Sequence, residues 1–331
     1  GYIKRTALAE YKLQNRGGIG TKGSTTRDED FIEHIYVANM HSTMLFFTRN
    51  GKCFWLKVYE IPEGSKTSKG RAIQNVINIE NEDKVCAYIN VKNLNDEEYI
   101  NSHYIVLGTK RGIVKKTTLE AYSRPRTNGV YAITIKDGDE LLEAMMTDGN
   151  SQILIAGHDG RCVRFNEEDA RAIGRVAAGV RGITIEDSDE VIGMICVSPK
   201  EESEEKHTIL VVSENGYGKK SELDDYRLTN RGGKGVKTLN ITEKTGKLIA
   251  LKDVTDDKDL MIINKSGITI RMAVSDIRVA GRATQGVKLI NIREGDSIAA
   301  VCVVNKSEDK LQDSQSDADT EEKTVNNDNK E

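Results

Sequence analysis

The chain has 331 residues, with 48 Lys or Arg against 52 Asp or Glu, and its formal net charge is −4. Aromatic residues make up only 5% of it, which predicts a modest, mainly aliphatic core. The five cysteines form no Cys-x-x-Cys pair and the five histidines have no metal-binding spacing, so neither disulfides nor a zinc site is expected. Without a signal peptide, transmembrane run or lipidation motif, the sequence favours a cytoplasmic protein with no membrane partner.

A glycine-centred phrase recurs six times along the chain. In each copy a turn glycine is followed by alternating apolar and basic residues, and a second glycine comes 19 residues later in five copies and 17 in the other. The pairs are Gly1/Gly20, Gly51/Gly70, Gly112/Gly129, Gly160/Gly179, Gly216/Gly235 and Gly267/Gly286. A period of about fifty residues built from short strands predicts a radial array of small β-sheets.

Each copy is expected to supply about four strands: an apolar strand, a strand after the turn glycine, a short strand after the second glycine, and a last apolar strand. The first strands are expected at Met44–Phe47, Tyr104–Leu107, Ile153–Ile155, Ile209–Val212 and Leu260–Ile263. The second strands are expected at Lys52–Val58, Ile113–Thr117, Arg161–Phe165, Tyr217–Ser221 and Ile268–Met272. Because Gly1 aligns with a turn glycine, the strand before it is absent and the chain is expected to be a fragment of a longer protein.

Residues 305–331 differ from the repeats in composition. They hold nine acidic and four basic residues and almost nothing apolar, which predicts a disordered acidic tail. Residues 1–304 are predicted to form one all-β domain of six repeats, the first of them incomplete at its N-terminus.

Charge alternates with position in the repeat. The six spans from the turn glycine to just past the second glycine sum to +20, whereas the rest of residues 1–304 sums to −19. Equivalent positions of a radial array lie at equivalent radius, so the alternation predicts a basic band on one surface, which is the electrostatic footprint of a polyanion track. The simpler alternative is that these charged residues lie on solvated turns and bind no partner.

Two loops carry a denser motif, Gln14-Asn-Arg-Gly-Gly-Ile-Gly20 and Thr229-Asn-Arg-Gly-Gly-Lys-Gly235. Glycine lets the backbone approach a phosphate closely and arginine supplies a planar charged donor, so both loops suit contact with the DNA backbone regardless of base sequence. Residues 18–23 also match Gly-x-Gly-x-x-Gly, but no βαβ unit surrounds them, and a dinucleotide site is not favoured. The single Arg-Gly-Gly copies likewise differ from low-complexity RNA-binding segments.

At these loops the chain resembles the C-terminal domain of the A subunit of bacterial DNA gyrase, which carries a Gln-basic-Arg-Gly-Gly-basic-Gly box in its first blade. The resemblance runs through residues 1–304 and includes Asp30-Phe-Ile-Glu-His-Ile-Tyr-Val-Ala-Asn39 and Gly281-Arg-Ala-Thr-Gln-Gly286. It implies a six-bladed, propeller-like β-pinwheel of four-stranded blades with DNA wrapped round its outer edge. Asn15 and Ile19 depart from the box, because both positions are usually basic.

The basic spans and the resemblance together identify candidate DNA-contacting residues. They are Lys12, Gln14, Arg16, Gly17, Gly18, Gly20, Lys22, Arg27, Lys66, Lys69, Arg71, Lys115, Lys116, Arg124, Arg126, Arg164, Arg175, Arg181, Lys219, Lys220, Arg227, Arg231, Gly232, Gly233, Lys234, Lys237, Arg271, Arg278, Arg282 and Lys288.

The resemblance implies sequence-independent binding, bending and wrapping of DNA, which lets the ATP-hydrolysing topoisomerase introduce negative supercoils. It implies no catalytic residue, metal or cofactor in this fragment, because ATP and Mg²⁺ bind elsewhere in the holoenzyme. The implied partners are double-stranded DNA, the N-terminal breakage-reunion domain of the same polypeptide, and the B subunit of gyrase in an A2B2 assembly on the chromosome.

Two other functions stay open. One is that of the homologous domain of topoisomerase IV, which presents DNA without a chiral wrap. The other is a non-catalytic WD-type propeller that scaffolds proteins, but such repeats carry Trp-Asp or Gly-His signatures and this chain has one Trp.

Overall fold

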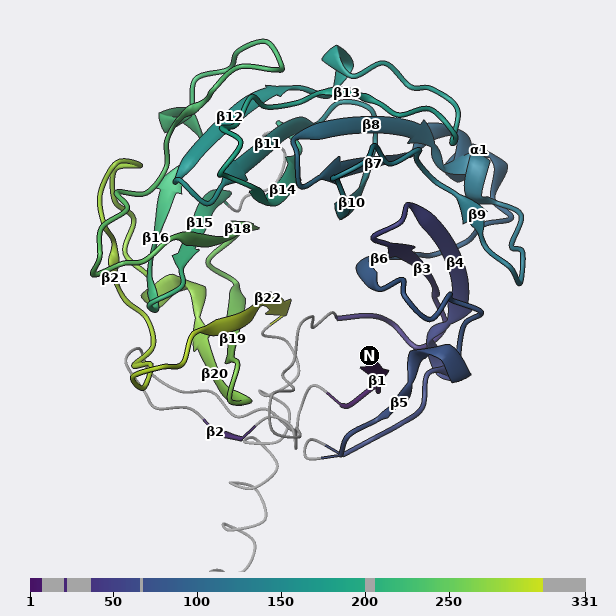
Figure 1. Ribbon diagram of the computed structural model, residues 1–331, viewed down its shortest axis with the longest axis horizontal. Coiled ribbons are helices and arrows are strands. Elements are labelled where there is room, and N and C mark those ends of the chain that lie inside the picture. The colour runs from purple at the N-terminus through teal and green to yellow at the C-terminus, as the bar shows by residue number, and fades with distance from the viewer. Residues whose placement is uncertain (8–20, 23–36, 66–67, 200–205, 306–331) are drawn as a thin grey trace, which may run out of the picture.

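The computed structural model describes residues 1–7, 21–22, 37–65, 68–199 and 206–305, which form small antiparallel sheets arranged in a ring (Figure 1). Five of these sheets have four strands each, and a two-stranded sheet joins β1 (Tyr2–Ile3) to β5 (Arg71–Ala72). The radial all-β architecture predicted from the repeat is confirmed. The described residues form five four-stranded blades, however, and not the six that the resemblance implied.

The blades, named A to E in chain order, share one strand order from the centre of the ring outward (Figure 1). Blade A is β6 (Val85–Val91), β3 (Thr43–Thr48), β4 (Lys52–Lys57) and β9 (Val130–Tyr131). Blade B is β10 (Leu141–Thr147), β7 (Tyr104–Thr109), β8 (Ile113–Thr118) and β13 (Val180–Arg181). Blade C is β14 (Val191–Val197), β11 (Gln152–Gly157), β12 (Arg161–Asn166) and β17 (Val236–Lys237).

Blade D is β18 (Leu248–Val254), β15 (Thr208–Ser213), β16 (Tyr217–Glu222) and β21 (Val287–Lys288). Blade E is β22 (Ile298–Asn305), β19 (Lys258–Asn264), β20 (Ile268–Ala273) and β2 (Thr21–Lys22). Because β22 includes Asn305, the ordered domain extends one residue beyond the predicted boundary at 304. The rest of the predicted tail lies outside the described residues.

Strand exchange interlocks the blades. The outermost strand of blades A to D comes from the repeat that follows, as when β13 pairs with β8 through Val180 and Val114. In blade E the outermost strand comes from the first repeat, because β2 pairs with β20 through Thr21 and Thr269. The two ends of the repeat array are therefore joined by backbone hydrogen bonds.

The turn glycines close the hairpins within the blades. Gly112, between β7 and β8, has φ +85°, a conformation that side chains other than glycine rarely adopt. An added Cβ there would also lie 2.7 Å from the carbonyl oxygen of Ile183, in the segment that follows β13 of the same blade. The periodic glycines are thus required by backbone conformation and by the close approach of neighbouring segments.

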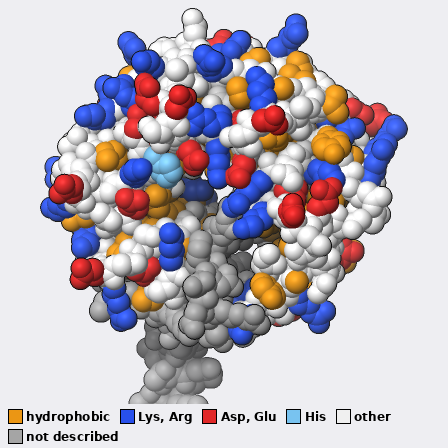
Figure 2. All heavy atoms as spheres, in the orientation of Figure 1, with side chains coloured by type: hydrophobic (Ala, Val, Ile, Leu, Met, Phe, Trp, Pro, Cys, Tyr) orange, Lys and Arg blue, Asp and Glu red, His pale blue; other side chains and the backbone are white. Residues whose placement is uncertain are grey.

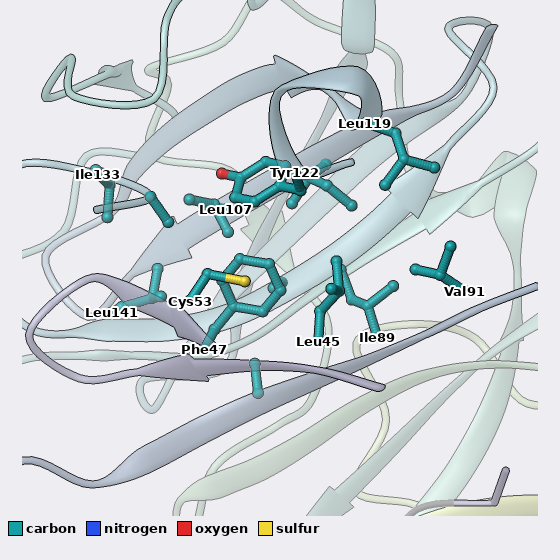
Figure 3. Close-up of a cluster of buried hydrophobic side chains, with 14 of the residues drawn as sticks. Leu45, Phe47, Cys53, Ile89, Val91, Leu107, Leu119, Tyr122, Ile133 and Leu141 are labelled. Atoms are coloured by element: carbon teal, nitrogen blue, oxygen red, sulfur yellow. The ribbon is translucent and has the colours of Figure 1, made fainter. Parts of the chain in front are cut away.

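The hydrophobic core lies between neighbouring blades. Figure 3 shows Leu45, Phe47 and Cys53 of blade A near Leu107 of blade B and near Leu119 and Tyr122, which lie in the 3-10 helix η4 (Leu119–Tyr122). The rings of Phe47 and Tyr122 meet edge to face with centroids 5.8 Å apart. The single tryptophan, Trp55, donates from Nε1 to the carbonyl oxygen of Tyr122 at 2.9 Å, so polar contacts also cross this interface.

Short helical turns begin the outer connections of the blades. They are the 3-10 helices η2 (Val58–Glu60), η4 (Leu119–Tyr122), η5 (Glu167–Asp169), η6 (Leu223–Asp225) and η7 (Val274–Asp276). One further 3-10 helix, η3 (Ile73–Asn75), follows β5, and one α-helix, α1 (Glu97–Ser102), precedes β7. None of the helices formed by the described residues is long and apolar enough to cross a membrane. All five cysteines are free thiols.

Candidate nucleic-acid interface

The outer rim of the ring consists of crossover segments, each of which begins at a 3-10 turn (Figure 1). Four of them end in the outermost strand of the preceding blade, and the first ends in β5, which pairs with β1. They span residues 58–72, 119–131, 167–181, 223–237 and 274–288. Together these segments hold 15 Lys or Arg residues against nine Asp or Glu. In the space-filling view, Lys and Arg side chains project round much of the outline of the molecule (Figure 2).

Three consecutive crossover segments repeat one pattern of cations. Relative to the second glycine, a basic residue stands eight positions before, four positions before and two positions after. The resulting lattice is Arg171, Arg175 and Arg181; Arg227, Arg231 and Lys237; and Arg278, Arg282 and Lys288. All nine side chains are exposed except those of Arg175 and Arg282, which are half-buried. The sequence prediction missed Arg171, although its alignment with Arg227 and Arg278 was a usable signal.

Backbone hydrogen bonds hold the Arg-Gly-Gly loop of residues 229–235 against the residues that directly follow the preceding crossover segment. The Gly232 amide donates to the Gly182 carbonyl at 2.6 Å, and the Gly233 carbonyl accepts from the Thr184 amide at 2.9 Å. Gly232 has φ +83°, so the sharp turn at this point needs a glycine.

A recess of about 500 Å³ opens beside this loop. Its lining includes Arg164, Arg227, Arg231 and Lys234, together with the backbone of Gly232 and Gly233. Cationic side chains around a glycine backbone without side-chain bulk form a site that suits an anion such as a phosphate oxygen.

Five predicted DNA-contacting residues are buried, and for these the prediction is corrected. They are Lys115, Lys116, Lys219, Lys220 and Arg271, with exposed fractions of 0 to 6%. They lie on β8, β16 and β20, which follow turn glycines and in which four consecutive side chains, facing both sides of the sheet, are buried. Each of them is satisfied inside the protein.

Three of the five form buried or partly buried ion pairs. Lys116 Nζ lies 3.5 Å from Glu167 Oε1, and Arg271 Nη2 lies 2.9 Å from Asp259 Oδ2. Lys220 Nζ pairs with Asp256 Oδ1 at 2.5 Å. These cations stabilise contacts inside the ring and are not available to DNA.

Lys115 and Lys219 occupy equivalent positions and donate to backbone carbonyls. Lys115 donates to Ala132 and Arg175, and Lys219 donates to Gly281. Burial lowers the pKa of Lys115 to about 7, assisted by the nearby positive charge of Arg175. Burial likewise lowers the pKa of Lys219 to about 8.

Arg164 is half-buried and its guanidinium is committed to the fold. Its Nη1 donates to the carbonyl oxygens of Leu223 at 2.9 Å and Tyr226 at 2.7 Å, and its Nε donates to Gln152 Oε1 at 2.8 Å. Burial lowers its pKa below the ordinary value of arginine. Although Arg164 lines the recess, its Nε and Nη1 already have partners inside the protein.

The remaining predicted residues divide into two groups. The exposed ones on the rim are Lys69, Arg71, Arg124, Arg126, Arg181, Arg227, Arg231, Gly233, Lys234, Lys237, Arg278 and Lys288, beside the half-buried Arg175, Gly232 and Arg282. Lys12, Gln14, Arg16, Gly17, Gly18, Gly20, Arg27 and Lys66 lie outside the described residues, and Lys22 lies in β2.

The model of the family described as the DNA gyrase C-terminal domain, a β-propeller, matches residues 1–39, 42–87, 103–148, 151–198, 207–255 and 258–305. The chain belongs to the DNA gyrase C-terminal domain family. The six matched segments follow the six glycine-paired repeats, so the resemblance inferred from the sequence is confirmed.

Relatives of this gyrase-family chain include the A subunits of two staphylococcal DNA gyrases. The one from Staphylococcus epidermidis is 43% identical over 308 residues, which cover 93% of this chain and 34% of the relative. The one from Staphylococcus aureus is 42% identical with the same coverage. The chain therefore spans about a third of the length of these relatives.

Two solved structures share the fold of this gyrase-family domain. A structure described as the DNA gyrase A C-terminal domain has a TM-score of 0.80 at 24% identity and covers 92% of this chain and 96% of its own. The C-terminal domain of DNA topoisomerase IV has a TM-score of 0.71 at 23% identity and covers 96% of this chain and 95% of its own.

Proposed function

We propose that this domain binds double-stranded DNA through its phosphates, bends it round the outer rim and wraps it as part of a DNA gyrase. The observation that carries the proposal is the lattice of nine cations at three equivalent positions in three consecutive crossover segments. Regular spacing on a curved edge suits a curved polyanion, and contacts of this kind hold DNA regardless of base sequence. The family and the staphylococcal relatives support the same function.

We infer that β1 and β5 belong to a sixth blade. The pair repeats the strand exchange of blades A to D, because β5 of the second repeat lies beside β1 of the first, with Tyr2 opposite Ala72. The six segments matched by the family model support six repeats. With β2 completing blade E, a six-bladed pinwheel would give DNA a closed curved track.

In the whole enzyme this domain would act on DNA next to the segment that is cut. Bending a few tens of base pairs costs on the order of several kcal/mol, which phosphate contacts distributed over several blades can offset. The partners would be the N-terminal breakage-reunion domain of the same polypeptide and the B subunit of gyrase, in an A2B2 assembly. Those parts would hold ATP and Mg²⁺, and the enzyme would act on the chromosome in the cytoplasm.

A topological assay tests the wrap. The 331-residue chain is added to nicked circular DNA, the nick is sealed with ligase, and the linking number is measured. We expect a protein-dependent shift of one sign. Binding without a shift would indicate presentation of DNA in the manner proposed for topoisomerase IV, and absence of binding would contradict DNA recognition altogether.

The salt dependence of DNA affinity tests whether arginines of the rim contact phosphates. Replacing Arg171, Arg227 and Arg278 with Gln should make the slope of log affinity against log salt less steep by about three contacts, at about 0.9 per phosphate. In the matched control, Gln replaces Lys84, Lys244 and Lys247, which are exposed but lie outside the crossover segments. An equal loss in both variants would show that only total charge matters.

A further inference from the structure

The arginine four positions before the second glycine grips the preceding crossover segment at both of its ends. Arg231 donates from Nε to the carbonyl oxygen of Asp169 at 2.9 Å and from Nη1 to that of Arg181 at 3.1 Å. Asp169 ends the 3-10 turn that begins segment 167–181, and Arg181 is its last residue. One guanidinium thus fixes the distance between the start and the end of the segment.

The same arrangement recurs one repeat further along the chain. Arg282 donates from Nε to the carbonyl oxygen of Asp225 at 2.9 Å and from Nη1 to that of Lys237 at 2.7 Å. These acceptors occupy the same two positions in segment 223–237. One repeat earlier, Arg175 donates from Nη1 to the carbonyl oxygen of Tyr131 at 3.1 Å, at the end of segment 119–131. The contact with the last residue of the preceding segment therefore recurs in three consecutive repeats, and the contact with the 3-10 turn in two of them.

The residues whose carbonyls accept these hydrogen bonds include exposed cations of the rim. Arg231 holds the backbone of Arg181, and Arg282 holds the backbone of Lys237, and both of those residues extend exposed cationic side chains. A buried lysine also holds the loop of Arg282, because Lys219 donates to the carbonyl oxygen of Gly281 at 2.6 Å. The gripping arginine therefore sets the position of a phosphate-contacting residue in the segment before it.

The other lattice arginines have a different environment. Arg171, Arg227 and Arg278 are exposed. No side-chain hydrogen bond or ion pair involves them within the described part of the chain. By contrast, Nε and Nη1 of Arg231 and Arg282, two of the groups with which a guanidinium binds a phosphate in a fork, already donate to carbonyls.

We propose that Arg175, Arg231 and Arg282 are positioning residues that set the spacing of neighbouring crossover segments, while the cations eight before and two after the second glycine contact the phosphates. The inference rests on the proposed DNA-wrapping function. It gives the arginine of the Arg-Gly-Gly loop at 231 a role in the curvature of the rim, and not primarily in its affinity for DNA.

Charge-conserving substitutions separate the two roles. Lysine keeps the positive charge but cannot reach two carbonyls with a planar fork, so Arg231→Lys together with Arg282→Lys should break the grip and keep the charge. The matched control is Arg227→Lys with Arg278→Lys, in the same two segments. All four positions carry arginine and lie at the rim.

We expect the gripping variant to keep the salt slope of wild type to within about one phosphate contact, at about 0.9 each. Its linking-number shift at saturating protein should fall at least about twofold. Amide hydrogen exchange at Thr184 and Asn240, whose N–H groups donate to Gly233 and Thr284 across neighbouring segments, should become about tenfold faster. The control variant alters two phosphate-contacting residues, so it serves for the exchange measurement only, where its rates at Thr184 and Asn240 should match wild type.

The amides of Leu154 and Leu210, in the central strands β11 and β15, should keep their protection. Equal acceleration there would show general destabilisation and overturn the positioning role. The inference is also overturned if the gripping variant matches wild type in both wrap and exchange. It is overturned too if Arg231→Gln with Arg282→Gln flattens the salt slope while the Lys variant keeps a full wrap, because that pattern belongs to direct phosphate contact.

The exchange measurement needs no DNA. If the wild-type chain fails to bind DNA, the proposed function fails. The rates at Thr184 and Asn240 then still decide whether the two arginines hold neighbouring segments together.

Discussion

The buried ammonium group of Lys219 donates to the carbonyl oxygen of Gly281, 2.6 Å away, across the boundary between two repeats. The side chain is fully buried, and burial lowers its pKa to about 8. The nearby Arg282 lowers this pKa further, while Asp225 acts in the opposite direction. A lysine that the sequence places in a basic band is thus part of the interface between repeats.

This burial predicts a stability that rises with pH. In the unfolded chain the lysine keeps its ordinary pKa of 10.5, so the unfolded state binds the proton more tightly than the folded state. The contribution of Lys219 to the free energy of unfolding is therefore lowest below pH 8 and rises between about pH 8 and 10.5. Relative to wild type, Lys219→Met should lose this rise when urea midpoints are compared at pH 7 and pH 9.5.

Lys237→Met provides the control, because this lysine is exposed. It should follow the pH trend of wild type. If the stability of Lys219→Met also rises with pH as that of wild type does, the inference that burial lowers the pKa of Lys219 is wrong.

The ion pair between Lys116 and Glu167 predicts a separation of stability from DNA binding. Glu167 is fully buried and accepts from the Thr147 hydroxyl at 2.8 Å and the Ser151 amide at 2.9 Å, while Lys116 supplies its positive charge. Lys116→Met would leave a buried carboxylate without a counter-ion and should lower the free energy of unfolding by about 3–5 kcal/mol. The salt slope of DNA binding should stay unchanged.

Arg171→Met is the reciprocal variant, measured by the same urea denaturation and salt titration. Its side chain is exposed, so its effect on stability should stay within about 0.5 kcal/mol. It should instead flatten the salt slope by about one phosphate contact, at about 0.9 each. A large change in the slope for Lys116→Met would show that this lysine reaches DNA after all.

Sequence periodicity predicted the strands because two physical requirements repeat with it. Turn glycines such as Gly112 need a positive φ, and the apolar runs before them must be buried between blades. The exchange of strands between blades is not visible in the periodicity, which does not show which blade a short strand joins. The helix α1 at Glu97–Ser102 was not predicted, because a six-residue helix before one repeat has no periodic signal.

The buried cations could not be predicted from charge. Lys115 and Lys116 follow each other in β8, and a lysine pair in a strand suggests at least one solvent-exposed side chain. Both are buried, because one donates to backbone carbonyls of crossing segments and the other pairs with Glu167. The hydrogen bonds from Arg231 to Asp169 and Arg181 could not be predicted from the sequence either, because their acceptors are backbone carbonyl oxygens, which every residue has.

Three glycines of the Arg-Gly-Gly loop predict different tolerances to alanine. Gly235 has φ +75°, and an added Cβ would lie 2.4 Å from the Cys162 carbonyl oxygen, so Gly235→Ala should be strongly destabilising. Gly232 has φ +83°, but an added Cβ would meet nothing closer than the Arg181 carbonyl oxygen at 3.6 Å, so Gly232→Ala should cost about 1–2 kcal/mol through backbone strain alone. Gly233 has no positive φ and meets nothing closer than 4.0 Å, so Gly233→Ala should leave the fold intact.

Thermal melting of the three variants tests this order. An equally large loss for Gly233→Ala and Gly235→Ala would contradict it. Because Gly233→Ala leaves the fold intact, any loss of DNA affinity in that variant would be due to the side-chain bulk that the loop presents to phosphate.

The acidic C-terminal residues predict an internal competitor of DNA. Residues 306–331 contain nine acidic and four basic residues and follow β22 directly, so they are covalently tethered to the same domain as the cations of the rim, which gives them a high effective concentration. Deletion should begin at Lys306, because Asn305 pairs with Lys258 in blade E. We expect the deletion to tighten DNA binding most at low salt, and the gain to shrink as the Debye length shortens.

A length-matched variant separates charge from bulk in this segment. Changing the nine acidic residues of 306–331 to Asn or Gln keeps the chain length and removes the negative charge. If charge competes with DNA, this variant should bind as tightly as the deletion at both low and high ionic strength. If it binds as wild type does while the deletion binds more tightly, the segment acts by occupying space. Equal affinity of wild type, deletion and neutral variant at low salt would show that these residues play no part in DNA binding, and that the rim alone sets the affinity.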